Sequence, residues 1–248
     1  MPMLKLAGMS ERGPRAENQD AAGWSERRGA VLLFAADGLG GLPHGAFASQ
    51  HVKKLLLGAF QQAEAPGAEP AHFLEQSALA ANQALLNQGA TDPAYAGTST
   101  TLSAALVTEA GLWTLNIGDS RTQRLDPSLT RLTCLTQEHS LVGEAVAAGQ
   151  LTPEAAFGHP EGHIVTSCLG MQPAELRIDL QAHPPLEAGE YLLCTTDGIH
   201  DLLRPSAILQ SLGKAPRKPE AMLSQLAKAV QAAGPRDNFS AVLARWEG

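Results

Sequence analysis

The stretch Val31-Leu32-Leu33-Phe34-Ala35-Ala36-Asp37-Gly38 decides the expected fold, because a short apolar run ends abruptly in Asp-Gly. The run predicts a buried strand over residues 31–36. Strands of the same kind are predicted at 101–107, 112–117, 191–196 and 239–246. The first two of these flank Thr108-Glu109-Ala110-Gly111, which predicts a tight antiparallel hairpin. The sheet is therefore expected to be mainly antiparallel.

Three amphipathic patterns predict helices that cover the sheet. The first two carry apolar faces at Val52, Leu55, Leu56, Ala59 and Phe60 and at Leu74, Ala78, Ala81 and Leu85. We expect Gly89 to end the second helix, and the third to run from near Pro219 to Gly234-Pro235. Strands and helices without strict alternation favour a layered α+β fold. Residues 1–248 are expected to form one domain, with 140–170 as a surface subdomain.

Composition narrows the class of protein before any motif is considered. The 248 residues are 44% apolar and carry a formal net charge of −7, which suits a globular enzyme and disfavours sequence-independent nucleic-acid binding. No run approaches the roughly 18 apolar residues of a membrane span, and the start lacks the apolar core of a signal peptide. We expect a cytoplasmic monomer with no membrane partner. Its three cysteines have no CxxC spacing, and we interpret them as inert core thiols: Cys134, Cys168 and Cys194.

Carboxylates stand at the ends of several predicted strands. Asp37-Gly38, Gly118-Asp119 and Asp197-Gly198 each follow an apolar run, and Asp237 stands just before the last strand. Each pair alone is also a common turn. Strand ends on one edge of a layered sheet can meet, however, and clustered carboxylates repel one another unless a cation neutralises them. Oxygen ligands favour Mg²⁺ or Mn²⁺ over zinc or copper.

Eight short motifs run in order from end to end of the chain. They are Arg15-x-x-Asn18-Gln19-Asp20, Ala36-Asp37-Gly38-Leu39-Gly40-Gly41, Gly97-Thr98-Ser99-Thr100-Thr101, Gly118-Asp119-Ser120-Arg121, Leu135-Thr136-Gln137-Glu138-His139-Ser140, Thr166-Ser167-Cys168-Leu169-Gly170, Cys194-Thr195-Thr196-Asp197-Gly198 and Arg236-Asp237-Asn238-Phe239-Ser240. Each motif alone is weak. Together and in register they resemble the bacterial type 2C metal-dependent protein Ser/Thr phosphatases.

The resemblance implies a fold and a set of metal ligands. The fold is a four-layer α-β-β-α sandwich, in which helices flank two central, mainly antiparallel sheets and the metals lie in a cleft at one end. Asp37 would bridge two ions, Mn²⁺ or Mg²⁺, and the Gly38 carbonyl would bind one of them. Asp197 and Asp237 would complete the other ion's ligands. In bacterial members a third, looser ion is held by the residues that match Asp119 and Asp197.

The resemblance also implies hydrolysis of phosphoserine and phosphothreonine by direct attack of a metal-bridging hydroxide. Besides Asp37, two catalytic residues are implied: Asp20 would hydrogen-bond to metal-bound water, and Arg15 would grip the phosphate. The planar guanidinium of Arg15 suits a phosphate dianion. The implied partners are phosphorylated proteins, the substrates of a bacterial Ser/Thr kinase in signal transduction.

The chain departs from the family pattern at three positions. Leu39 stands where eukaryotic relatives carry a His proposed to protonate the leaving group, which leaves His44 and His139 as open substitutes. Ser167 replaces the usual Arg of its motif, and Glu138 replaces an Asp. Both border the 140–170 flap, so we expect them to affect flap conformation or substrate choice and not metal binding.

Two alternative functions stay open. A carboxylate cage also serves two-metal phosphodiesterases and nucleases, although the acidic balance and the lack of basic stripes count against that reaction. A non-catalytic, phosphoprotein-binding relative would keep the fold without the chemistry, although the matching Asp positions are all present here.

Overall fold

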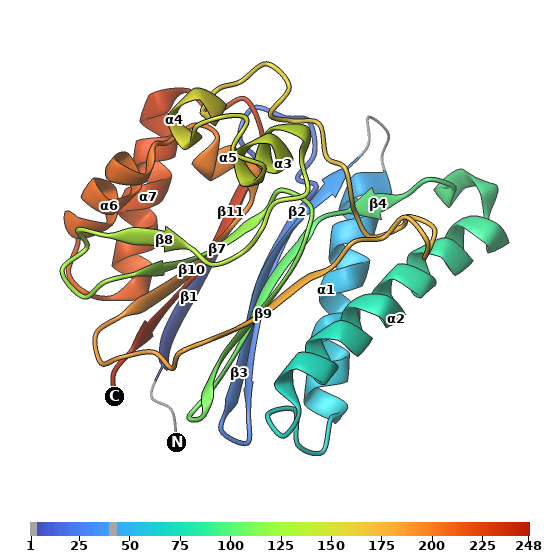
Figure 1. The fold of residues 1–248 in the computed structure, drawn as a ribbon, viewed down its shortest axis with the longest axis horizontal. Coiled ribbons are helices and arrows are strands. Elements are labelled where there is room, and N and C mark those ends of the chain that lie inside the picture. The colour runs from blue at the N-terminus through green and yellow to red at the C-terminus, as the bar shows by residue number, and fades with distance from the viewer. Residues whose placement is uncertain (1–3, 40–43) are drawn as a thin grey trace.

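Two antiparallel sheets face each other in the centre of the molecule, with helices on both outer faces (Figure 1). The computed structural model describes residues 4–39 and 44–248. The first sheet has the order β1 (Leu4–Glu11), β11 (Phe239–Trp246), β10 (Tyr191–Thr195), β7 (Arg121–Leu125) and β8 (Leu132–Cys134). The second has the order β2 (Asp20–Arg27), β3 (Ala30–Leu39), β5 (Leu102–Thr108), β6 (Gly111–Ile117) and β9 (Asp179–His183), and β4 (Ser99–Thr100) pairs with β3. The predicted sandwich is confirmed.

Helices cover each sheet on its outer face. α1 (His44–Gln62) and α2 (Pro70–Thr91) pack on the second sheet, and α6 (Pro205–Gly213) and α7 (Pro219–Ala233) pack on the first (Figure 1). The short elements are η1 (Pro93–Tyr95), α3 (Leu141–Ala147), α4 (Pro153–Ala156) and α5 (Asp197–His200). α3, α4 and α5 gather at one end of the sandwich (Figure 1). In the described residues, no helix combines the length and the apolar character needed to cross a membrane.

The continuous apolar run of β3 follows from its place between two layers of core. Successive strand residues point to opposite faces. Leu32 and Phe34 therefore contact the cluster formed with α1 and α2, while Leu33 and Ala35 pack between the sheets against first-sheet residues such as Val242. Both faces are dry, which explains why the run has no polar residue before Asp37.

Two sequence predictions about local structure are wrong. α2 does not end at Gly89 but continues to Thr91. A Cβ on Gly89 would lie 3.1 Å from the Tyr95 carbonyl oxygen, so the glycine permits the close approach of η1. Cys134 is not a core thiol, since it is exposed on the edge strand β8, whereas the other two cysteines are buried.

The subdomain prediction falls on a segment that has its own short helices. α3 and α4 lie within 140–170, and Thr152 is the N-cap of α4, where its hydroxyl accepts a hydrogen bond from the Ala155 N–H. That this segment moves as a flap stays a prediction. Gly40 and Gly41 of the second motif lie outside the described residues.

Candidate active site

The site begins with two carboxylates that the β2–β3 pairing places opposite each other, Asp20 and Asp37. Like charges facing each other in an antiparallel pair destabilise it. Burial raises the pKa of Asp20 to about 7, although a hydrogen bond from Thr196 opposes the shift. Burial, and then the charge of Asp20, raise the pKa of Asp37 well above its usual range. Without a cation, this pair retains a proton near neutral pH.

Three further carboxylates approach this pair from other elements. Asp119 lies in the turn between β6 and β7, Asp197 begins α5, and Asp237 precedes β11. Burial raises the pKa of Asp119 well above normal, and the charge of Asp197 adds to the shift. Burial also raises the pKa of Asp197, followed by the charges of Asp37, Asp201 and Asp237. The structure thus brings the Asp residues of five motifs into one electrostatic cluster.

The donor set of this cluster suits a hard cation. One carboxylate oxygen of each of Asp20, Asp119 and Asp197 is buried without a hydrogen-bond partner in the described part of the chain. A buried polar atom left unpaired is costly, and Mg²⁺ and Mn²⁺ prefer oxygen ligands. Within residues 4–39 and 44–248, no three or more His, Cys, Asp and Glu side chains are gathered tightly enough to enclose an ion without adjustment. The Asp237 carboxylate accepts a hydrogen bond from Arg15.

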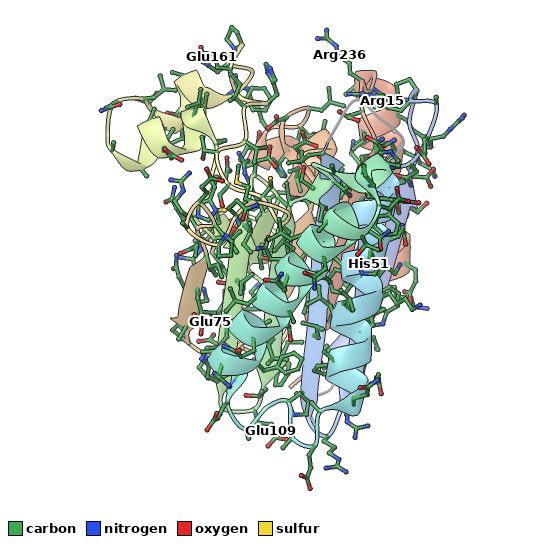
Figure 2. The ribbon with its side chains drawn as sticks, turned by 90° about the vertical axis from the view of Figure 1, so that its right-hand side faces the viewer. Arg15, His51, Glu75, Glu109, Glu161 and Arg236 are labelled. Atoms are coloured by element: carbon green, nitrogen blue, oxygen red, sulfur yellow. The ribbon has the colours of Figure 1, made fainter. Side chains whose placement is uncertain are left out.

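The Arg15 loop is held against the same end of the molecule. Asn238 donates to the carbonyl oxygens of Arg12 (2.6 Å) and Glu17 (2.9 Å). Arg15 Nη2 then donates to Asp237 Oδ2 at 2.6 Å, and its Nε donates to the Arg236 carbonyl at 3.0 Å. Figure 2 shows Arg15 and Arg236 at one end, far from the β5–β6 hairpin. Arg15, the residue predicted to bind the phosphate, therefore lies beside the carboxylates and forms an ion pair with one of them, Asp237.

Hydroxyl groups from the motifs fix the backbone of the site. The Thr101 hydroxyl accepts from the Asp37 N–H at 2.8 Å, and the Thr101 N–H donates to the Asp37 carbonyl at 2.8 Å. The Thr196 hydroxyl donates to Asp20 Oδ2 at 2.8 Å and accepts from the Ser240 N–H at 2.9 Å. The sequence alone gives these hydroxyls no role. Their only signal was their place inside the motifs.

The glycines beside the aspartates pack against neighbouring backbone. A Cβ on Gly38 would overlap the Gly45 carbonyl oxygen, and one on Gly198 would overlap the Asn238 carbonyl oxygen. Gly118 has φ 101°, a conformation that favours glycine. In the structure, these glycines thus let one chain segment approach another closely.

The Ser167 departure has a structural role that the sequence did not indicate. Ser167 is fully buried, and its hydroxyl accepts from the Arg177 N–H (2.9 Å) and donates to the Arg177 carbonyl (3.2 Å). The Arg177 guanidinium donates to Thr166 Oγ1 and to Glu144 Oε1, both at 2.6 Å. Ser167 therefore anchors an arginine that reaches α3 of the predicted flap.

Glu138, another departure from the family pattern, forms an ion pair with Arg121 of the fourth motif. The two histidines considered as proton donors have different surroundings. His139 is buried, and its Nδ1 accepts from the Gly118 N–H at 3.3 Å, which gives the ring a structural contact. Burial lowers its pKa. His44 begins α1. Neither His is shown to be the proton donor.

Four layers that carry a buried carboxylate cluster at one end define a class of α+β sandwich with a candidate cation site. The chain belongs to one family within it, Protein phosphatase 2C, whose profile matches residues 7–246. It is 34% identical over 244 residues to the serine/threonine protein phosphatase PstP of Mycobacterium tuberculosis, covering 98% of this chain and 45% of PstP. It is 34% identical over 200 residues to PhpP of Streptococcus pneumoniae, covering 78% of each. The chain thus spans about half the length of PstP.

A solved structure agrees with this assignment. The crystal structure of the PstP catalytic domain in complex with two manganese ions superposes with a TM-score of 0.83 at 30% identity, covering 99% of both chains.

Proposed function

We propose that this protein is a metal-dependent protein phosphatase that hydrolyses phosphoserine and phosphothreonine in proteins, using Mn²⁺ or Mg²⁺. The observation that carries the proposal is the cluster of buried carboxylates with unpaired oxygens, brought together from separate motifs. Family membership and the two manganese ions of the PstP catalytic domain support the same chemistry.

In this proposal, four of the acidic residues would be cation ligands. Asp37 and the Gly38 carbonyl, with Asp197 and Asp237, would hold two cations, and Asp119 would join Asp197 at a third. When bound, such cations lower the pKa of water and stabilise charge on phosphoryl oxygens.

Asp20 and Arg15 would act beside the metal ligands. Asp20 is fixed by Thr196 and would orient water through its free oxygen. Arg15 would exchange Asp237 for the substrate phosphate, because its guanidinium is already at the site and its side chain is 55% exposed. The partners would be phosphoproteins made by a bacterial Ser/Thr kinase, and the enzyme would act in the cytoplasm as a monomer.

The test is hydrolysis of p-nitrophenyl phosphate and of a phosphothreonine peptide. Turnover should require added Mn²⁺ or Mg²⁺, stop in EDTA and resist okadaic acid. Asp197→Ala should abolish turnover and keep its circular dichroism spectrum, while the exposed Asp92→Ala should behave like wild type. Full activity in EDTA, or a wild-type rate in Asp197→Ala, would contradict the proposal.

A further inference from the structure

One buried histidine lies beside the carboxylate cluster and belongs to no motif used so far. His200 is the last residue of α5 and is 3% exposed. Its Nδ1 lies 2.8 Å from Thr195 Oγ1, at the end of β10, and its Nε2 lies 3.2 Å from the carbonyl oxygen of Asp119. The ring therefore joins two segments that each carry a predicted metal ligand.

The two contacts determine which ring nitrogen carries the proton. A carbonyl oxygen only accepts hydrogen bonds, so Nε2 must be the donor toward Asp119. Burial, and then the positive charge of Arg121, lower the pKa of His200 well below its usual value, so the ring is neutral. A neutral ring has one N–H, so Nδ1 accepts from the Thr195 hydroxyl. All polar atoms of the ring are satisfied in this single arrangement.

Asp119 lies in a turn between the two sheets, where its neighbours Gly118 and Ser120 also have hydrogen bonds, to His139 and Thr101. The turn crosses from β6 in the second sheet to β7 in the first. β7 pairs with β10 from Arg121 onward, where Arg121 faces Thr195, but Asp119 lies two residues earlier, outside that pairing. The direction of the Asp119 carboxylate relative to Asp197 thus depends on how the turn is held.

We infer that His200 is a positioning residue for the carboxylates of Asp119 and Asp197, and that it sets the affinity of the cation site these two residues share. The inference rests on the proposed function, because it requires these residues to bind metal. His200 touches neither substrate nor ion and acts through the Asp119 carbonyl. Residues that orient metal ligands from outside typically change metal affinity by about 10–100-fold when replaced.

Substitutions can separate the hydrogen bonds of His200 from its bulk. His200→Leu puts an apolar side chain of similar size in place of the ring and leaves the Asp119 carbonyl and the Thr195 hydroxyl without their partner. His200→Gln can place an amide N–H near the position of Nε2. Thr195→Val removes only the second contact. His183 offers a matched control, because its Nε2 also lies 2.8 Å from a threonine hydroxyl, that of Thr114.

The experiment is Mn²⁺ titration of the EDTA-stripped proteins by calorimetry, with thermal unfolding and Mn²⁺-dependent turnover measured on the same samples. We expect His200→Leu to weaken the loosest Mn²⁺ site by about tenfold or more, His200→Gln to recover most of that loss, and Thr195→Val to lie between them. His183→Leu should bind Mn²⁺ like wild type. Turnover by His200→Leu should need a correspondingly higher Mn²⁺ concentration.

Distinct outcomes overturn distinct claims. Unchanged Mn²⁺ affinity in His200→Leu, or no recovery in His200→Gln, would overturn the positioning role. If His200→Leu does not fold, wild-type affinity in Thr195→Val together with lost affinity in a folded His200→Gln would overturn it too. A wild-type protein that binds no Mn²⁺ and shows no turnover would instead overturn the proposed function.

Discussion

Replacing Asp20 by Asn should stabilise the metal-free protein, and the gain should depend on pH. Asp20 is 1% exposed and faces Asp37 across β2 and β3. Burial raises its pKa from 3.8 to about 7. A folded state that holds the proton more tightly than the unfolded chain loses stability as pH rises. The loss is absent below about pH 4, grows between about pH 4 and 7, and is complete above that range.

The pKa shift sets the size of the effect. At about 1.4 kcal/mol per pKa unit, the raised pKa of Asp20 destabilises the metal-free fold by up to about 4 kcal/mol at pH 8 and by about 2 kcal/mol at pH 5. Asn has the same shape, can accept the Thr196 hydrogen bond and can donate to Asp37. We therefore expect Asp20→Asn to recover much of this energy at pH 8.

Urea unfolding in EDTA at pH 8 and pH 5 measures the difference. Asp126→Asn is a control of opposite sign, because hydrogen bonds from the Ser128 hydroxyl and the Arg131 N–H hold the pKa of Asp126 below its usual range. That variant should lose stability at pH 8 and lose less near pH 3. Equal stability of Asp20→Asn and wild type at pH 8, or an equal gain at both pH values, would refute the reasoning.

Three other substitutions test packing, flap anchoring and substrate binding. Gly198→Ala should lower the free energy of unfolding by about 3 kcal/mol, because the added Cβ would overlap neighbouring backbone. Gly58→Ala, in open space on α1, should raise the free energy of unfolding by up to about 1 kcal/mol. Urea midpoints in the reverse order would contradict this prediction. Ser167→Ala should lower the free energy of unfolding by about 1–3 kcal/mol, because it removes the hydroxyl that bonds both the N–H and the carbonyl of Arg177. It should also speed proteolysis within 140–170, and an unchanged cleavage rate would show that Ser167 does not anchor this segment. Arg15→Ala should raise KM for a phosphothreonine peptide about tenfold or more and change kcat less, with Arg15→Lys in between; an unchanged KM would exclude the phosphate contact.

Five strands could be predicted from the sequence because both of their faces are largely buried: β3, β5, β6, β10 and β11. The strand predicted at 239–246 coincides with β11, and the predicted hairpin coincides with β5 and β6. β1, β2 and β9 were missed, since each lies at a sheet edge and carries polar residues or glycine within an interrupted apolar pattern. Such strands form because a neighbour offers unpaired backbone groups. Local composition does not show that.

The Asp positions could likewise be predicted, but their mutual geometry could not. Asp-Gly after an apolar run marks a strand end, whereas the register that sets Asp20 against Asp37 depends on how β2 pairs with β3. The contact between His200 and Asp119 joins residues 81 positions apart, and no local pattern announces it. The sequence therefore indicates candidate residues for the chemistry, while the residues that contact them from other elements are found only in the fold.

The position of the cluster couples metal binding to the stability of the whole sandwich. Asp20 and Asp37 belong to the second sheet, Asp197 and Asp237 adjoin strands of the first, and Asp119 lies in the turn between the sheets. Repulsion among these groups, when they are ionised, opposes the approach of the two sheets at this end, and a shared cation would offset it. Binding to the folded state alone adds to its stability in proportion to the logarithm of metal concentration. Added Mn²⁺ should therefore raise the free energy of unfolding of the wild type, because an ion bound in the proposed site would relieve the repulsion among these carboxylates.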